Sequence, residues 1–247
     1  MKHHYCKRFA FTLAEVLITL GIIGVVAALV IPTFVRKYQY QVYATKLAED
    51  YAILSNAIKM AEREYGPQET WETPTDSNYR EFFDKYLRPH LQLLDNECTN
   101  NNSGNCRFQT KDMAGGTRIN AIGTTGTEAW GFVKVYLANG SMVGMRFQNA
   151  HNAFNVFIDV NGEKGPNRQG VDTFMLILAF ADSTSFKDYI GKFVLYWGLP
   201  STRDSVLKQY CSKEGAYPGL GCGALLQRNG FKIPKNEGWP SGYKYPY

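Results

Sequence analysis

The chain has 247 residues, 45% hydrophobic and 20% charged, which is ordinary globular composition and enough for one compact domain with appendages. Lysine and arginine number 27 against 22 aspartates and glutamates, a mild excess that gives no independent reason to expect a nucleic-acid partner. Charge is spread unevenly, because Glu15 is the sole charged residue in residues 9–35 while the chain after Arg36 is mixed. The sequence therefore predicts one hydrophobic segment followed by one water-compatible domain.

The hydrophobic segment, residues 9–35, is longer than the roughly 20 residues that a helix needs to cross the hydrocarbon core of a bilayer. Lys2, Lys7 and Arg8 precede it, so we expect the short N-terminus to stay in the cytoplasm and the C-terminal part to be exported into an oxidising compartment. A cleavable secretory signal is the rival, but the run is too long for one, lacks a closing A-x-A element and continues past Pro32.

A second helical segment follows Pro32. Apolar or aromatic residues recur there at alternating spacings of four and three, the pattern of one buried helix face. They are Tyr43, Leu47, Tyr51, Leu54, Ile58, Ala61 and Tyr65. Gly66 followed by Pro67 is a typical helix end. Together with the membrane segment this predicts one helix over residues 11–65, about 80 Å long and bent at Pro32.

The rest of the chain predicts short helices, loops and an antiparallel sheet. Residues 77–87 predict a helix capped by Asp76 or Ser77, and residues 201–210 and 223–229 predict two more. Two alternating runs within residues 130–147 meet at Asn139-Gly140, a strong hairpin signal. Residues 154–160 and 171–180 predict a second strand pair, and residues 189–197 are either a further strand or packed chain. The predicted class is α+β, a long N-terminal helix packed on an antiparallel β-sheet.

The cysteines agree with export. Cys98 and Cys106 bracket one short polar loop and Cys211 and Cys222 bracket another, so two local disulfides are the natural pairing. Four cysteines permit three connectivities, and proximity in the sequence favours this one without proving it. A zinc site is the alternative, but zinc ligands are usually spaced more closely than these. Cys6 is left over and precedes the membrane segment.

Glu15 is the unusual residue of the hydrophobic segment. A carboxylate at the bilayer centre costs roughly 2.5–3.5 kcal/mol on insertion scales, so it needs a partner or a function. One interpretation is that Glu15 lies near the interface and reaches the lipid headgroups. The other is that it pairs with a cation in the apolar phase, which a new α-amino group would supply if the chain were cut just before Phe11.

The stretch KRFAFTLAEVLITLGIIGVVAALVIP, residues 7–32, resembles the N-terminus of type IV prepilins and type II secretion pseudopilins. The resemblance implies cleavage between Ala10 and Phe11 by a prepilin peptidase and N-methylation of Phe11. It also implies that Glu15 pairs with the free N-terminus of a neighbouring subunit as that subunit enters a fibre, where the opposite charges offset each other's desolvation. Ala10 departs from the usual glycine before the cut, and Ala14 from the larger aliphatic residue that is common there.

The resemblance is specific over about the first thirty-five residues and architectural beyond them, where the pilin fold combines a long helix, an antiparallel sheet and a C-terminal disulfide loop. Gly24, Ala28 and Pro32 also fit, since some assembled pilins lose helix between a glycine and a proline placed like Gly24 and Pro32. Helix packing through small residues in the membrane explains their spacing equally well. The implied organisation is a leader at 1–10, a transmembrane and assembly helix at 11–35, and an exported pilin-like domain at 36–247.

Chemistry beyond assembly has little support in the sequence. His90 and His151 have no recognisable catalytic neighbours and no hydrolase, zinc-protease or nucleotide-binding motif is present, so we do not expect an enzyme. One loop clusters oxygen ligands of the kind that calcium prefers, and some major pseudopilins hold calcium in such a loop. Its candidates are Asp159, Asn161, Glu163 and Asp172. The EF-hand pattern does not fit, and a plain turn at Asn161-Gly162 is the favoured interpretation.

The sequence therefore predicts a structural subunit, a pilin or pseudopilin. The expected partners are a prepilin peptidase and methylase, other pilin or pseudopilin subunits, an inner-membrane assembly platform and the lipid bilayer. The expected location is the inner membrane, by a single span, and then a surface pilus or periplasmic pseudopilus. Two alternatives stay open: an uncleaved single-span protein with an exported binding domain, and an exported enzyme that uses the helix as an anchor.

Overall fold

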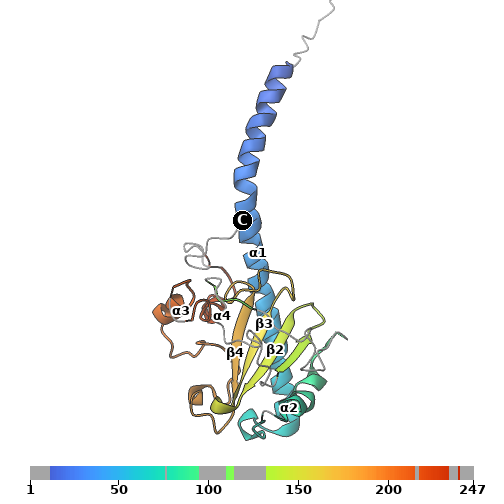
Figure 1. The fold of residues 1–247 in the computed structure, drawn as a ribbon, viewed down its shortest axis with the longest axis vertical. Helices are drawn as coiled ribbons and strands as arrows, with labels where there is room; N and C mark the ends of the chain where they lie inside the picture. Colours follow the sequence, from blue (N-terminus) through green and yellow to red (C-terminus); the bar gives the residue numbers. More distant parts are fainter. Residues whose placement is uncertain are drawn as a thin grey trace, which may run out of the picture. The chain divides into compact units, whose positions relative to one another are not determined.

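The computed structural model describes residues 12–75, 77–94, 110–113, 132–214, 217–233 and 239. The chain divides into two compact units, Met1–Tyr40 and Gln41–Tyr247. Helix α1, Leu13–Tyr65, belongs to both, with its apolar first part in one unit and its amphipathic second part in the other (Figure 1). The long helix predicted from the sequence is confirmed, and it is continuous through Pro32.

Helix α1 ends where the sequence predicted. The Gly66 N–H donates to the carbonyl of Glu62 at 3.0 Å, and Gly66 has a φ of +87°, a left-handed conformation that glycine adopts without steric penalty. Pro67 then has no N–H with which to continue the helix. The chain turns through a short 3-10 helix, Gln68–Thr70, in which the buried Gln68 donates its side-chain amide to the carbonyl of Ala179 at 2.7 Å.

In the part of the chain that the structure describes, the sheet of the second unit has five antiparallel strands in the order β1-β2-β3-β4-β5 (Figure 1). They are β1 Phe132–Tyr136, β2 Met142–Gln148, β3 Ala153–Asp159, β4 Thr173–Ala179 and β5 Val194–Leu195. Both predicted strand pairs, β1 with β2 and β3 with β4, are confirmed. At the first turn Gly140 has a φ of +85°, and the Asn139 side chain accepts a hydrogen bond from the Ser141 N–H at 3.0 Å. In the third predicted run, residues 189–197, the antiparallel pairing covers the two residues of β5, and Ile190 forms an isolated parallel bridge with Ala179.

One face of the sheet packs on the second part of α1. Leu47, Leu54, Ile58 and Ala61 are buried, together with strand residues that include Val135. Tyr43 and Tyr51 of the predicted helix face are half-buried at the margin of this contact.

Tyr65 was predicted to lie on the buried helix face, but it is 37% exposed. Its ring meets the ring of Tyr86 edge-on, with 5.1 Å between the ring centroids. It is the last residue of α1, and its ring packs on α2 instead of the sheet. The predicted α+β fold, with a long helix on an antiparallel sheet, is confirmed.

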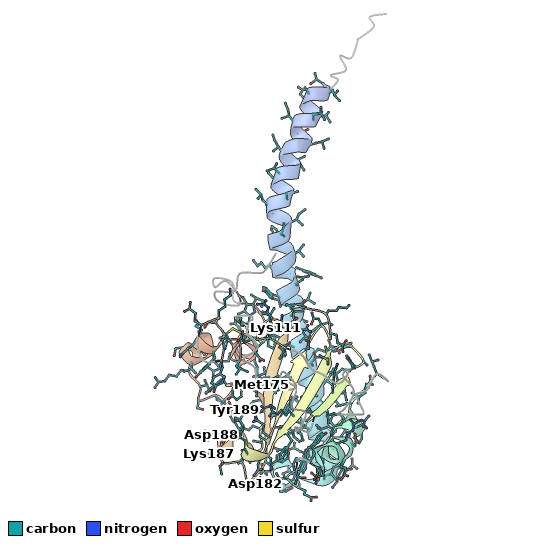
Figure 2. The ribbon with its side chains drawn as sticks, in the orientation of Figure 1. Lys111, Met175, Asp182, Lys187, Asp188 and Tyr189 are labelled. Atoms are coloured by element: carbon teal, nitrogen blue, oxygen red, sulfur yellow. A yellow bond between two sulfur atoms is a disulfide. The ribbon has the colours of Figure 1, made fainter. Side chains whose placement is uncertain are left out.

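The opposite face of the sheet is covered too. Every residue of β3 and β4 is buried, because the chain around residues 186–199 closes over the second face. Phe157, Met175 and Ile177 form a second apolar cluster there with Tyr189 and Leu199; Figure 2 labels Met175 and Tyr189.

The described residues of this unit also form three short α-helices: α2 Tyr79–Tyr86, α3 Asp204–Tyr210 and α4 Cys222–Arg228. Helix α2 begins later than predicted, because its N-cap is Asn78 and not Ser77. Asn78 accepts a hydrogen bond from the N–H of Thr75 at 2.6 Å, which holds the turn that leads into the helix. Asp76, the other predicted cap, lies outside the described residues.

We expect Leu54→Ala to destabilise the sheet-bearing unit by about 2–5 kcal/mol, because it removes a side chain that is 2% exposed between α1 and the sheet and leaves a cavity. Chemical denaturation of the full chain in detergent would measure this change. Met60→Ala is the matched control on the same helix, since Met60 is 48% exposed and its truncation should change stability by less than about 1 kcal/mol. Equal losses in the two variants would contradict the packing described.

Candidate functional site

Glu15 lies in the first turn of α1 and closes a capping box with Thr12. The backbone N–H and the hydroxyl of Thr12 both donate to Glu15 Oε2, at 2.8 and 2.9 Å. In return the Glu15 N–H donates to the hydroxyl of Thr12 at 3.2 Å. The arrangement satisfies amide groups that a helix start leaves without partners and places a negative charge at the positive end of the helix.

Sequence reasoning gave Glu15 a role and none to Thr12, although the capping-box pattern, threonine followed three residues later by glutamate, was readable in the sequence. Ala10 and Phe11, the predicted cleavage and methylation residues, lie outside the described residues.

The first part of α1 exposes apolar side chains around its whole circumference. Leu17, Leu20, Ile23 and Val26 are each more than half exposed. One helix of the described chain, α1, is long and apolar enough to cross a membrane, and the apolar part of it lies near the N-terminus. This supports a single-span membrane protein.

Gly24, Ala28 and Pro32 are spaced four residues apart and so lie along one side of α1. All three are exposed, and a Cβ atom added at Gly24 would meet no other atom within 4 Å. The helix is intact through all three residues. A side lined by small residues leaves room for another helix to approach closely.

The predicted oxygen cluster divides into two sets. Asp159 is the last residue of β3 and Asp172 immediately precedes β4, and both are fully buried. Asn161 joins them, since its N–H donates to Asp159 Oδ1 at 3.2 Å and its side-chain amide donates to the Tyr43 hydroxyl at 3.2 Å. Glu163 points elsewhere: its Oε1 accepts a hydrogen bond from Lys134 Nζ at 2.7 Å and another from the Tyr136 hydroxyl. The hydrogen bond from Lys134 lowers the pKa of Glu163.

A calcium ion takes six to eight oxygen ligands, and the two remaining carboxylates each already accept two hydrogen bonds. Asp172 accepts the N–H groups of Asn167 and Arg168 at 2.9 and 2.7 Å, one on each oxygen. Asp159 accepts the N–H of Asn161 on one oxygen and the hydroxyl of Thr173 on the other, the latter at 3.3 Å. Their oxygens thus already face hydrogen-bond donors. No group of three or more histidine, cysteine, aspartate or glutamate side chains in the described residues could hold a metal ion.

A third buried carboxyl group, Asp50, was not predicted. It is fully buried on α1, three residues after Leu47 and four before Leu54, so it shares their face. The side-chain amide of Asn139 in the β1–β2 turn donates to Asp50 Oδ1 at 2.7 Å. Burial raises the pKa of Asp50 to about 6, against the opposing effect of that hydrogen bond. The sequence did contain an indication of this group, because Asp50 is an acidic residue on a helix face that is otherwise apolar.

The surroundings of Asp159 and Asp172 also shift the pKa values of these two groups. Burial, and after it the charge of Asp172, raises the pKa of Asp159. Burial likewise raises the pKa of Asp172, while the two backbone hydrogen bonds from Arg168 and Asn167 oppose the rise. Neutral hydrogen-bond donors stabilise a carboxylate less than a nearby cation does, so the cost of burial dominates at both residues.

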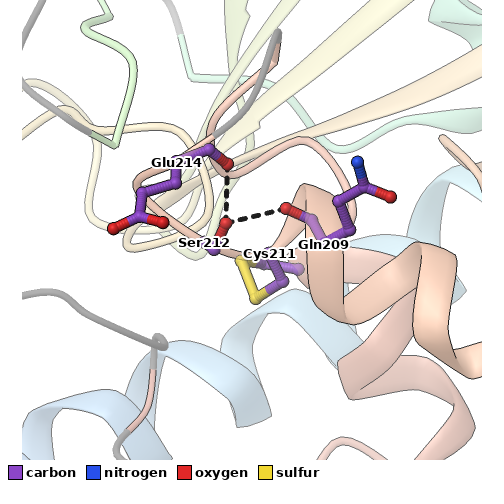
Figure 3. Close-up of a disulfide and its surroundings, with 5 residues drawn as sticks. Gln209, Cys211, Ser212 and Glu214 are labelled. Atoms are coloured by element: carbon purple, nitrogen blue, oxygen red, sulfur yellow. Dashed lines mark hydrogen bonds between the residues drawn. A yellow bond between two sulfur atoms is a disulfide. The ribbon is translucent and has the colours of Figure 1, made fainter.

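The C-terminal disulfide joins Cys211, at the end of α3, to Cys222, the first residue of α4 (Figure 3). Both cysteines are buried. Ser212 continues the turn after α3, because its hydroxyl lies 2.8 Å from the carbonyl oxygen of Gln209 and 2.7 Å from that of Glu214 (Figure 3). This disulfide was predicted and is present, whereas Cys98, Cys106 and Cys6 lie outside the described residues.

The two histidines that follow the membrane segment have structural contacts. His151 Nδ1 lies 2.7 Å from the Ser185 hydroxyl, and its backbone carbonyl accepts a hydrogen bond from Ser183. These contacts tie the turn at residues 183–186 to the connection between β2 and β3. His90 Nε2 lies 3.7 Å from a carboxylate oxygen of Glu64 at the end of α1.

A family model described as a family of unknown function (DUF6613) matches residues 33–241. The matched range contains all five strands and the second part of α1, and residues 1–32, with the Glu15 motif, precede it. No curated protein and no solved structure matches the chain.

We expect Cys211→Ser to destabilise the sheet-bearing unit by roughly 2–4 kcal/mol, because the disulfide restricts the unfolded chain between α3 and α4. Denaturant unfolding of the full chain, with and without a reductant, would measure this loss. Reductant should destabilise the parent protein by at least a similar amount and should destabilise the variant by less than it destabilises the parent. A variant as stable as the oxidised parent would contradict a structural role for the disulfide.

Proposed function

The chain belongs to this family of unknown function, and we propose its role from its own residues: it is a structural subunit, a pilin or pseudopilin. A prepilin peptidase processes it, and it assembles into a type IV pilus or a type II secretion pseudopilus. The observation that carries the proposal is the N-terminal sequence motif of Phe11, Thr12 and Glu15, of which Glu15 lies in the first turn of an exposed apolar helix.

Processing would take place between Ala10 and Phe11, two residues before the first helical residue, Leu13. The cut removes Lys2, Lys7 and Arg8 and leaves Phe11 with a free amine, which the methylase then modifies. Thr12 and Glu15 stay in the mature chain, so the capping box that begins α1 survives processing. The mature subunit would therefore keep a defined helix start at the end of its membrane segment.

Assembly would depend on Glu15. In the single chain its carboxylate is held by the two donors of Thr12, both neutral, so its charge has no counter-ion from that residue. The amine of a neighbouring Phe11 would supply the opposite charge, and pairing offsets the desolvation that each group suffers in an apolar phase. A contact between chains at this position also fixes the axial step from one subunit to the next.

The apolar surface of α1 would contact lipid before assembly and other subunits after it. Before assembly it spans the inner membrane once, with the sheet-bearing unit exported. After assembly the same surface packs against the helices of other subunits, and the small-residue side at Gly24, Ala28 and Pro32 permits close approach. The partners are thus the lipid bilayer, the peptidase and methylase, an inner-membrane assembly platform and other subunits. Turnover of a substrate has no part in this role.

A single-span membrane protein that is never cleaved, with an exported binding domain, is the second candidate. The capping box favours it, because Thr12 satisfies Glu15 within its own chain, and a helix start of this kind has a local purpose without any neighbour.

We expect Glu15→Gln to be processed normally and to enter the fibre at least roughly tenfold less than the parent. The substitution removes the charge and keeps an oxygen that can accept from Thr12, so the helix start is retained. Loss of one partner of a desolvated charge pair costs about 2–5 kcal/mol. Quantitative immunoblots of sheared fibres and membranes, in cells that make the fibre, would give the ratio.

Glu49→Gln is the matched control, because Glu49 is an exposed glutamate on the same helix and lies outside the motif. We expect it to enter fibres at the level of the parent. Normal incorporation of Glu15→Gln would refute the pairing of Glu15 with a neighbouring amine.

A further inference from the structure

Helix α1 enters the sheet-bearing unit at Gln41, and the β3–β4 loop contacts the helix directly after this point. Asn161 of that loop donates its side-chain amide to the Tyr43 hydroxyl at 3.2 Å. Lys46, about one helical turn after Tyr43, donates its ammonium group to the carbonyl of Val160 at 3.0 Å. These two contacts place the β3–β4 loop at the end of the unit at which α1 enters it.

The chain after α4 reaches the same end of the unit. The Gln41 side chain accepts a hydrogen bond from the N–H of Ile233 at 3.3 Å and donates one to the carbonyl of Phe231 at 3.4 Å. The ring of Phe231 also packs against the ring of Tyr51 on α1, with 6.2 Å between the ring centroids. Gln41 thus holds residues 231–233 beside the point at which α1 enters the unit.

A third segment, residues 110–113, is bound to the β3–β4 loop. The N–H of Lys111 donates to the carbonyl of Asn167, and the N–H of Gln169 donates to the carbonyl of Lys111, both at 2.8 Å. Figure 2 shows Lys111 close to the place where α1 enters the unit. Three segments that are far apart in the sequence therefore gather around residues 41–46 of α1. We call these segments, residues 110–113, 160–169 and 231–233, the proximal end of the unit.

The proximal end carries one exposed lysine on each of its three segments. They are Lys111, Lys164 and Lys232. The acidic side chains that these described segments contain are not free on the surface, because Asp112 is 4% exposed and Glu163 pairs with Lys134 at 2.7 Å. The adjoining loop after α3 adds one charge of each sign, Lys213 and Glu214. The described surface of the proximal end therefore has an excess of positive charge.

The opposite end of the sheet has the opposite balance of charge. Strand β4 begins at the proximal end and ends at Ala179, whose carbonyl is contacted by Gln68 at the far end of α1. Acidic residues outnumber basic ones among the exposed charged side chains of residues 63–72 and 182–188. These side chains are Arg63, Glu64, Glu69, Glu72, Asp182, Lys187 and Asp188. The exposed lysines of the proximal end are thus part of an uneven distribution of charge along the unit.

The proximal end also follows the membrane segment closely. Val35 is the last residue of the apolar run, and Gln41 lies about 9 Å further along the same unbroken helix at 1.5 Å per residue. The Debye length at physiological ionic strength is about 8 Å, so charges at this distance from a lipid surface still interact with it. Lys59 lies about 36 Å along α1 from Val35, which is beyond the reach of that interaction.

We propose that the proximal end binds the anionic headgroups of phospholipids in the membrane that α1 spans, through Lys111, Lys164 and Lys232. A negatively charged lipid surface attracts lysine side chains that lie close to it, and their long flexible stems let the ammonium groups reach the headgroups. This contact would hold the sheet-bearing unit against the membrane surface. The inference rests on the single membrane span and not on the assignment as a pilin or pseudopilin, so it applies equally to an uncleaved chain.

A lipid surface fits this end of the unit better than a nucleic acid does. The chain as a whole has only a mild excess of basic residues, 27 against 22 acidic ones, which gives little long-range attraction for a polyanion. The membrane span, by contrast, keeps the three lysines close to the headgroups at all times. Such tethering gives a high effective concentration, so weak contacts are sufficient.

The test is acetylation of the full chain in lipid nanodiscs by acetic anhydride, a neutral reagent, with the rate at each lysine read by mass spectrometry of peptides. The nanodiscs contain phosphatidylcholine alone or a mixture with phosphatidylglycerol. We expect Lys111, Lys164 and Lys232 to react at least roughly threefold more slowly in the mixed nanodiscs, and high salt to remove the difference. The exposed Lys59 and Lys187 should react equally in both.

A double variant, Lys111→Gln with Lys232→Gln, separates binding from mere proximity to lipid. Both side chains are exposed, so the fold should be retained. We expect the protection of Lys164 by phosphatidylglycerol to decrease in this variant, because fewer cations hold the end against the surface. Lys59→Gln is the matched control, and it should leave the protection of Lys164 at the level of the parent.

Equal rates at the three lysines in the two kinds of nanodisc would overturn the proposal, as would undiminished protection of Lys164 in the double variant. Inorganic phosphate and a DNA oligonucleotide are added separately to phosphatidylcholine nanodiscs, and we expect neither to protect the lysines. Protection by phosphate as strong as that by phosphatidylglycerol would show a site for free anions, and protection by the oligonucleotide would show a nucleic-acid surface. Either result would refute lipid binding. Neither peptidase nor fibre takes part in these measurements, so their outcome is separate from that of the proposed function.

Discussion

Residues 41–65 of α1 bury Leu47, Leu54 and Ile58 against one face of a five-stranded sheet, and the remainder of the unit is arranged around that contact. Because a helix presents only one stripe to a sheet, the apolar residues of this part recur at spacings of three and four. Residues 13–35 of the same helix carry apolar side chains on all sides. One helix is thus suited to two surroundings, an apolar phase for its first part and a protein core for its second.

The acidic groups also fall into two sets, one in the apolar first part of α1 and one in the sheet-bearing unit. Glu15 stands in the apolar part, exposed, and its carboxylate is held by Thr12 alone among the recorded hydrogen bonds. Asp50, Asp159 and Asp172 stand in the folded part, where neutral donors surround them. Burial disfavours the charge of the second set, and an apolar phase would disfavour the charge of Glu15. For Glu15 the proposed remedy is an amine from another chain, whereas the buried groups accept hydrogen bonds from neutral donors within their own chain.

Much of the fold could be read from local patterns. The spacing of Leu47, Leu54 and Ile58 predicted the packed helix, Gly66-Pro67 its end, and Asn139-Gly140 the first hairpin, because each depends on residues close in the sequence. Long-range choices were not readable. Glu163 was grouped with Asp159 and Asp172 by proximity in the chain, but it pairs with Lys134, two strands away. Asp50 was overlooked because its partner, Asn139, is 89 residues distant. Tyr65 fitted the helical spacing, yet it lies where α1 leaves the sheet.

The central claim is that the chain is cut before Phe11 so that a new amine can meet Glu15 of a neighbouring subunit. Mass spectrometry of the N-terminal peptide, from protein purified out of cells with an active prepilin peptidase, tests it most directly. The account predicts a peptide that begins at Phe11 and carries one methyl group on its α-amine. A peptide that begins at Met1, or close to it, would contradict the account and favour an uncleaved membrane protein.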